Sequence, residues 1–262
     1  MDFFLRELKG AYGINNLGRT YSNPPPKVKG LFKTEGTGME EKVSWFTATF
    51  MSSIGKKLVM AITGLSFCLF LAMHLVGNFF YYGGGSAFEG YSAHLHERLV
   101  LLRLAEGGLI FFALLHVLFG GILYFQNLAA RPKGYVMKKS VIRKTTPGGQ
   151  TVSSRLQAYT GLYILVFVII HLFAFTFVDR TAGGGLYRIV TTAFQDPLYA
   201  AFYVFSVIVV GFHINHGFWS AFQTIGANHP KYMPAVKVIS MVYALIIGAC
   251  FSSIPVFIFL SA

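Results

Sequence analysis

Five long stretches of the chain are apolar and contain no Asp, Glu, Lys or Arg. A helix rises about 1.5 Å per residue, so about 20 such residues cross the roughly 30 Å hydrocarbon core of a bilayer. Strands of a membrane barrel are about ten residues long and alternate in polarity, which these stretches do not. The pattern predicts an all-α membrane protein, a bundle of five transmembrane helices within residues 58–82, 107–130, 156–178, 197–230 and 238–262.

Composition agrees with a membrane location. Of the 262 residues 54% are hydrophobic and only 12% are charged, whereas soluble domains carry about 25% charged residues. An ordinary water-soluble globule is therefore excluded. Cys68 and Cys250 lie in apolar stretches far apart in the sequence, which favours helix packing over a disulfide or a zinc cluster.

The first part of the chain has a different character. It contains consecutive prolines from Pro24 to Pro26, mixed charge, no apolar span and no recognisable signal peptide. We expect residues 1–50 to form a cytoplasmic N-terminal tail and residues 51–262 to form the five-helix membrane domain.

Lysine and arginine are concentrated in alternate connections between the apolar stretches. The tail through residue 57 holds nine, the 126–155 connection seven and the 226–237 connection two, which makes 18. The other two connections hold four: Arg98, Arg103, Arg180 and Arg188. Because basic loops stay on the cytoplasmic side, the N-terminus is expected inside and the C-terminus outside. The net charge of +12 therefore belongs to membrane-flanking loops, which favours anionic lipid or a soluble protein partner and argues against nucleic acid.

An internal similarity relates the first two stretches to the third and fourth. Adding 97 to the numbers of Ala61, Thr63, Gly64, Leu65, His74, Leu75, His116, Gly120, Phe125 and Gln126 reaches an identical residue each time. Both halves run in the same sense across the membrane, so the pattern predicts a parallel repeat of two helices, with the fifth helix outside it.

The repeat selects four histidines inside the apolar stretches. A single intramembrane histidine is often a packing residue bonded to a neighbouring helix, but four at repeated spacing, without acidic partners, favour a cofactor. From the helical rise, His74 and His171 lie about 22 to 24 Å from the inner face, and His116 and His213 about 16 Å from it. We therefore expect His74 with His171 to bind an outer haem iron, and His116 with His213 an inner one. Without a Cys-x-x-Cys-His stretch, both haems are expected to be b-type and non-covalent.

Two imidazoles on each iron leave no open position for a ligand, so such haems transfer electrons. A flat macrocycle between helices needs small residues beside it, and the glycines near the ligands suit this role, although ordinary helix packing explains them equally well. They are Gly64, Gly120, Gly161 and Gly217. His216 ranks second as a ligand because it breaks the repeat. His94, His96 and His229 fall at the membrane boundaries and need no special role.

Residues 52–262 resemble a known family, the single-chain, two-haem cytochrome b anchor of succinate dehydrogenase and fumarate reductase. The resemblance rests on Thr63-Gly64 ahead of His74, on Ala87-Phe88 with Tyr91 and His94, and on the segment from Phe212 to Trp219. It implies the same four iron ligands, His74, His116, His171 and His213, and marks residues 51–262 as a dihaem cytochrome b domain.

The resemblance implies further partners and a location. The chain would anchor a flavoprotein with FAD and an iron-sulfur subunit to the cytoplasmic face of the inner membrane, and exchange their electrons with menaquinone or another quinone. Succinate or fumarate chemistry, in the respiratory chain and the tricarboxylic acid cycle, would take place on the flavoprotein. The resemblance also points to a dimer of heterotrimers. An acidic residue that some members carry two positions before the fourth ligand is Gly211 here, which leaves proton transfer along that route in doubt.

A quinone site is expected near the outer haem, where an apolar cleft meets a group that exchanges protons. Glu106 is the candidate catalytic residue, although it and its charged neighbours could equally anchor the helix at the headgroups. Two other readings stay open: a dihaem cytochrome b anchor of a hydrogenase or formate dehydrogenase, and a haem-free transporter whose histidines relay protons.

Overall fold

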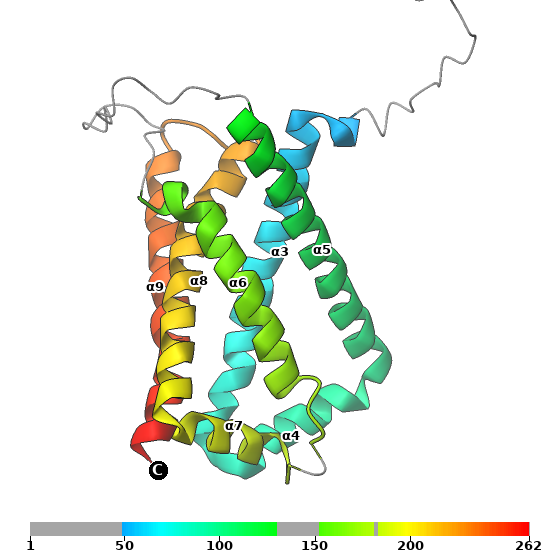
Figure 1. Ribbon diagram of the computed structural model, residues 1–262, viewed down its shortest axis with the longest axis vertical. Helices are drawn as coiled ribbons and strands as arrows, with labels where there is room; N and C mark the ends of the chain where they lie inside the picture. Colours follow the sequence, from blue (N-terminus) through cyan, green and yellow to red (C-terminus); the bar gives the residue numbers. More distant parts are fainter. Residues whose placement is uncertain (1–48, 130–151, 181–182, 262) are drawn as a thin grey trace, which may run out of the picture. The chain divides into compact units, whose positions relative to one another are not determined.

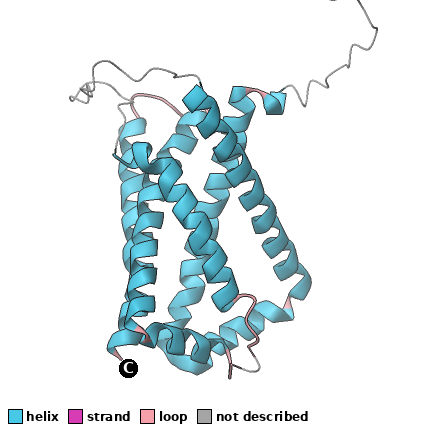
Figure 2. Cartoon of the chain, viewed as in Figure 1, coloured by secondary structure: helices cyan, strands magenta, loops and turns pink. Residues whose placement is uncertain are grey.

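The structure, a computed structural model, describes residues 49–129, 152–180 and 183–261. Figure 2 shows that these residues form helices and connecting loops. The elements are α3 (Ser53–Phe79), η1 (Phe80–Gly83), α4 (Gly84–Glu97), α5 (Leu99–Ala129), α6 (Val152–Phe175), α7 (Leu186–Gln195), α8 (Pro197–Thr224) and α9 (Met233–Leu260). The predicted tail lies outside the described residues, apart from its last two, and so does most of the basic 126–155 connection.

Five helical segments are long and apolar enough to cross a membrane, as the sequence predicts. They contain α3, α5, α6, α8 and α9. Many of their large apolar side chains are exposed, for example Ile54, Leu114 and Leu245. Outward-facing apolar side chains at this density are expected when the solvent is hydrocarbon, and the chain is a multi-pass helical membrane protein.

Helix ends differ from the predicted spans where charged residues lie inside a helix. Helix α3 begins at Ser53, ahead of residue 58, and the side chain of Ser52 accepts a hydrogen bond from the Gly55 amide at 3.0 Å. The early turn contains Lys56, which is only 7% exposed and donates from Nζ to Gln126 Oε1 of α5 at 3.2 Å. A charge that finds a partner on the next helix does not end a helix, so the apolar run underestimates its length.

Helix α8 is shorter than its predicted span of 197–230. Asp196 begins it, because one carboxylate oxygen accepts from the amides of Leu198 at 2.8 Å and Tyr199 at 2.9 Å. It ends at Thr224, two residues before Gly226, whose φ of 93° lies in the left-handed region that favours glycine. The remaining apolar residues of the predicted span belong to the loop before α9.

Two shorter helices, α4 and α7, were not predicted. Figure 1 shows them side by side at the end of the bundle where α3 and α6 finish and α5 and α8 begin, and they are in contact. Glu89 of α4 joins them by accepting a hydrogen bond from the Tyr187 amide in the first turn of α7, at 2.7 Å. Tyr81 packs there as well, with its ring stacked on Tyr187 at 4.7 Å and its hydroxyl 2.6 Å from Thr191 Oγ1.

Helix α9 packs against α3 and α8 and completes the core. Ser240 of α9 is fully buried, and its hydroxyl donates to the backbone oxygen of Asn215 on α8. Tyr243 donates to the backbone oxygen of Cys68 on α3 at 2.5 Å. Such hydroxyl contacts between helices are worth about 1 kcal/mol each in a membrane, so α9 holds together helices from both halves of the predicted repeat. The repeat itself stays a prediction.

Candidate functional site

Two of the four intramembrane histidines, His116 of α5 and His213 of α8, face one another. Their ring centroids are 6.5 Å apart, with an angle of 66° between the ring planes. Both side chains are partly buried. The helices that carry them are separated by a long stretch of chain, so the approach of the two rings is a product of tertiary packing.

A threonine hydroxyl contacts each imidazole of this pair. Thr63 Oγ1 of α3 lies 2.9 Å from His116 Nδ1, and Thr160 Oγ1 of α6 lies 3.1 Å from His213 Nδ1. In both cases the threonine precedes the histidine by 53 residues. The same nitrogen is engaged by the same type of group on both sides of the pair.

Glycines accompany these contacts. A β-carbon built on Gly64 would lie 3.4 Å from His116 Cε1, and one on Gly161 would lie 3.3 Å from His213 Cε1. Larger residues there would push against the rings. Gly120 and Gly217 contact other groups: a β-carbon would meet Met60 Cε at 3.4 Å and Gln157 Nε2 at 3.7 Å. Only the first two glycines therefore border an imidazole.

The second pair joins His74 of α3 to His171 of α6. The ring centroids are 5.9 Å apart and the ring planes are nearly perpendicular, at 89°. Asn78 Nδ2 lies 3.3 Å from His74 Nε2 and donates to the backbone oxygen of His74 at 2.8 Å. The Nδ1 atom of His171 is buried and has no hydrogen-bond partner among the described residues.

Aromatic rings surround this second pair. Phe70 stacks on His74 with centroids 5.2 Å apart and planes 18° apart, and Phe251 of α9 lies 5.6 Å from the same ring. The rings near His171 are Phe167 at 6.0 Å, Phe175 at 5.5 Å and Tyr203 at 6.1 Å. These rings exclude water and form a low-dielectric environment for any charge at the pair.

Both pairs fit a haem iron by spacing and by donor chemistry. A metal–imidazole bond is about 2.0 Å, so two imidazoles on opposite sides of one metal have ring centroids roughly 6 to 6.5 Å apart. The observed 5.9 and 6.5 Å agree with this spacing. Among the described residues no cluster of three or more His, Cys, Asp or Glu side chains can hold a metal ion. Donors that come in twos suit a haem, which brings its own four nitrogens.

Glu106, the candidate quinone residue, lies on α5 and pairs with Arg103 one turn away. Arg103 Nη1 and Glu106 Oε2 are 2.7 Å apart, and the side chain of Glu106 is 35% exposed. The described hydrogen bonds and ring contacts do not join Glu106 to His74 or His171. The carboxylate lies in the N-terminal part of α5, in a partly exposed ion pair that stabilises the fold by at most about 1 kcal/mol.

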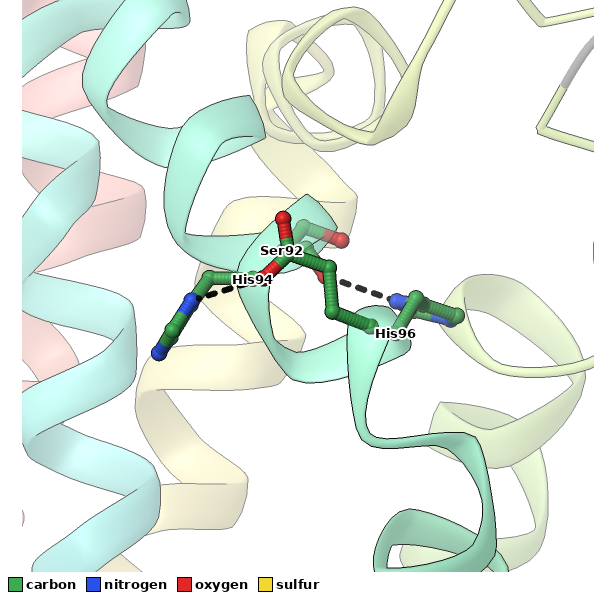
Figure 3. Close-up of polar contacts among 4 residues, drawn as sticks. Ser92, His94 and His96 are labelled. Atoms are coloured by element: carbon green, nitrogen blue, oxygen red, sulfur yellow. Dashed lines mark hydrogen bonds and ion pairs between the residues drawn. The ribbon is translucent and has the colours of Figure 1, made fainter.

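Histidines outside the two pairs have ordinary partners or none. In Figure 3, His94 and His96 point away from one another on α4. His94 Nδ1 pairs with Glu97 Oε2 at 3.1 Å. His96 Nδ1 lies 2.7 Å from the Ser92 backbone oxygen. His229 Nδ1 accepts from the Lys231 amide at 3.2 Å. His216 packs its ring edge against Trp219 at 4.9 Å, and its buried Nδ1 has no partner among the described residues.

Sequence reasoning did not assign Thr63, Thr160, Asn78 or Gln157 to the site. Gln157 of α6 reaches His213, with Nε2 3.4 Å from the His213 Nε2 atom and 3.4 Å from its backbone oxygen. A signal existed for the two threonines, because both belong to the residues repeated at an offset of 97. Their histidine partners could not be predicted, because the spacing of residues along the sequence does not determine how each helix is rotated about its own axis.

The fold and the paired histidines define the class, a multi-pass helical membrane protein with two pairs of facing imidazoles within its bundle. Comparisons with protein-family models, with curated proteins and with solved structures found no significant match for this chain. A more particular assignment therefore rests on the residues themselves.

Proposed function

We propose that the chain is the membrane anchor and electron-transfer subunit of a succinate dehydrogenase or fumarate reductase. In this proposal it holds two b haems and exchanges electrons between a cytoplasmic iron-sulfur subunit and a membrane quinone. It belongs to the enzyme succinate:quinone or quinol:fumarate oxidoreductase, and the dicarboxylate is converted on the FAD-containing partner.

One observation carries the proposal: two separate pairs of imidazoles lie at the spacing of a bis-histidine metal centre. His74 with His171 would hold one haem, and His116 with His213 the other. A haem held by two imidazoles supplies one-electron chemistry without an open coordination position. The protein fixes each ring by contacts on α3 and α6 and excludes water with apolar side chains.

The two-haem arrangement also explains the predicted repeat. One pair of helices carries one histidine for each of the two irons. Duplication of that pair in parallel supplies the second histidine for each iron. The offset of 97 and the two threonine contacts with equal separation of 53 residues support this arrangement.

The partner assignment rests on the basic side of the chain and on the resemblance. With 18 of 22 Lys and Arg residues in the tail and alternate loops, the predicted cytoplasmic face attracts an acidic protein surface and anionic lipid. An iron-sulfur subunit carrying a flavoprotein would dock there, with the N-terminus of this chain on the same side and the C-terminus across the inner membrane.

Glu106 is proposed to serve menaquinone or another quinone near the outer haem, from its partly exposed position on α5. Glu106→Gln replaces the carboxylate by an amide, which removes the proton acceptor and keeps the size and shape of the side chain. We expect quinone reduction by the complex to fall about a hundredfold, in line with the loss of a general base, while haem content stays the same. The matched control Arg103→Gln breaks the same ion pair and should leave most of the activity.

The spectrum of the purified protein tests the whole proposal. A reduced-minus-oxidised difference spectrum should show b-type haem, with about two haems per chain. Reduction of that haem by succinate in the purified complex selects the proposed enzyme. Reduction by hydrogen or formate alone selects the other dehydrogenases, and a folded but colourless protein selects the haem-free transporter.

A further inference from the structure

We infer that Thr63 and Thr160 are positioning residues that fix the tautomer of His116 and His213, and that they do so at only one of the two haem sites. The inference rests on the proposed function. It assigns a role to two hydroxyl groups that hold the ligands without touching the iron.

The hydroxyl proton of each threonine is already used. Thr63 Oγ1 lies 2.7 Å from the Val59 backbone oxygen, and Thr160 Oγ1 lies 3.0 Å from the Leu156 backbone oxygen. Two oxygens at such distances repel one another unless a proton lies between them, and a carbonyl has none to give. The hydroxyl must therefore donate to the helix carbonyl four residues earlier, as helical threonines commonly do.

The imidazole must then supply the other proton. A hydroxyl has one hydrogen, so a threonine that donates to its own helix can only accept from Nδ1. His116 and His213 consequently carry their proton on Nδ1 and leave a lone pair on Nε2, the form of imidazole that binds a metal. The amide of Gln157 agrees, because its Nε2 is a donor that faces the unprotonated His213 Nε2 at 3.4 Å.

The other pair lacks this device. Among the described residues, no hydroxyl contacts His74 or His171, and the His171 Nδ1 atom is buried without a partner. His74 is in polar contact with Asn78, whose Nδ2 atom lies 3.3 Å from His74 Nε2. The Nδ2 group of Asn78 can only donate, so it also favours a lone pair on His74 Nε2. The two sites therefore differ in whether a hydroxyl accepts a hydrogen bond from Nδ1 of the histidines.

The hydroxyl contact at one site is expected to lower the midpoint potential of the haem there. An Nδ1–H group that donates to an acceptor makes Nε2 more basic, and a more basic ligand favours ferric over ferrous iron. Loss of the hydroxyl should weaken haem binding at this site about tenfold. If ferric iron loses ten times more affinity than ferrous iron, the midpoint potential rises by 59 mV.

The test uses the complete chain in its complex, with Thr63→Val and Thr160→Val compared with the parent. Redox titrations followed by absorption and by electron paramagnetic resonance resolve the two haems. Thr63→Ser and Thr160→Ser keep the hydroxyl and should restore the parent potentials. Thr224→Val is the matched control, because Thr224 Oγ1 also donates to its own helix, at 2.9 Å to the Ser220 oxygen.

A raised potential or a selective loss of one haem in the valine variants, restored by serine, supports the inference. Unchanged potentials, or equal changes at both haems, overturn it and leave the proposed function in place. Loss of both haems in the valine variants also counts against it, because the hydroxyl would then serve the fold as a whole. A parent protein without any haem overturns the proposed function and the inference together.

Discussion

The His116–His213 pair and the His74–His171 pair are built from the same residue type in opposite surroundings. Each imidazole of the first pair has a threonine hydroxyl on Nδ1 and a glycine beside its ring. The imidazoles of the second pair are surrounded by aromatic rings, and the buried Nδ1 of His171 has no hydrogen-bond partner in the described part of the chain. Threonine hydroxyls contact both imidazoles of the first pair, whereas aromatic rings make most of the contacts of the second.

If both pairs hold haem as proposed, this contrast is expected to give the two haems different potentials. Hydrogen bonds to a ligand change its basicity, whereas apolar rings change the cost of placing charge on the metal.

Replacement of one ligand in each pair should separate the two sites completely. His116→Ala and His74→Ala each remove an axial nitrogen, and each chain should retain about one haem. The measurement is a haem-to-protein ratio with a difference spectrum, and the two variants should lose different spectral components. Unchanged pigment in both variants, and also in His171→Ala and His213→Ala, would exclude histidine ligation in this protein.

A bulky residue at a glycine of the first pair should weaken only that site. A β-carbon at position 161 would lie 3.3 Å from His213 Cε1, and Gly161→Val adds two methyl groups to that carbon. Displacement of the His213 ring should lower haem affinity at this site about tenfold. The measurement is haem retention during purification. Gly121→Val is the control, since a β-carbon there has no neighbour within 4 Å. Equal haem loss in both variants would point to general damage.

Aromatic contacts should tune the second pair more gently. Phe70 stacks on His74, and stacked rings contribute about 0.5 to 1.5 kcal/mol, so Phe70→Leu should change the haem equilibrium at this site a few-fold. Electron paramagnetic resonance should show altered signals for this haem alone. Phe67→Leu is a reciprocal control, because Phe67 lies edge-on to His116 at 5.7 Å. If both variants disturb the same haem, the two sites are not independent.

The smallest effect is expected at Gln157. Its two contacts with His213 are both 3.4 Å long, at which distance hydrogen bonds are weak. A metal on His213 Nε2 would replace one of them, so Gln157→Leu should change haem affinity by about twofold or less. The residue 97 positions earlier is Met60, already apolar, so Met60→Leu is the matched control. A large loss from Gln157→Leu would show that the amide supports the bound state.

The membrane helices could be predicted from the sequence because hydrocarbon demands long uncharged runs. Their ends could not, since Lys56 and the Arg103–Glu106 pair find partners and continue a helix through charged positions. The short helices were missed for a related reason. Helix α7 is ten residues long and amphipathic, and its first turn depends on Glu89 from another helix.

The candidate site also has features that the sequence predicts and features that it does not. The helical rise alone places His74 level with His171 and His116 level with His213, and those are the rings that lie together. Their role as haem ligands stays a prediction. The contact of Thr63 with His116 could not be predicted, because it depends on how two helices rotate about their own axes when they pack.

Helix α9 follows the other four membrane helices in the chain, yet it lies beside the first. It supplies Phe251 to the surroundings of His74, and it ties α3 and α8 through Tyr243 and Ser240. Since membrane helices leave the ribosome in order, the His74–His171 site is finished only after α9 has been inserted. If this site holds haem as proposed, haem is expected to bind there late in biogenesis, because a nascent chain halted before α9 lacks Phe251 beside His74.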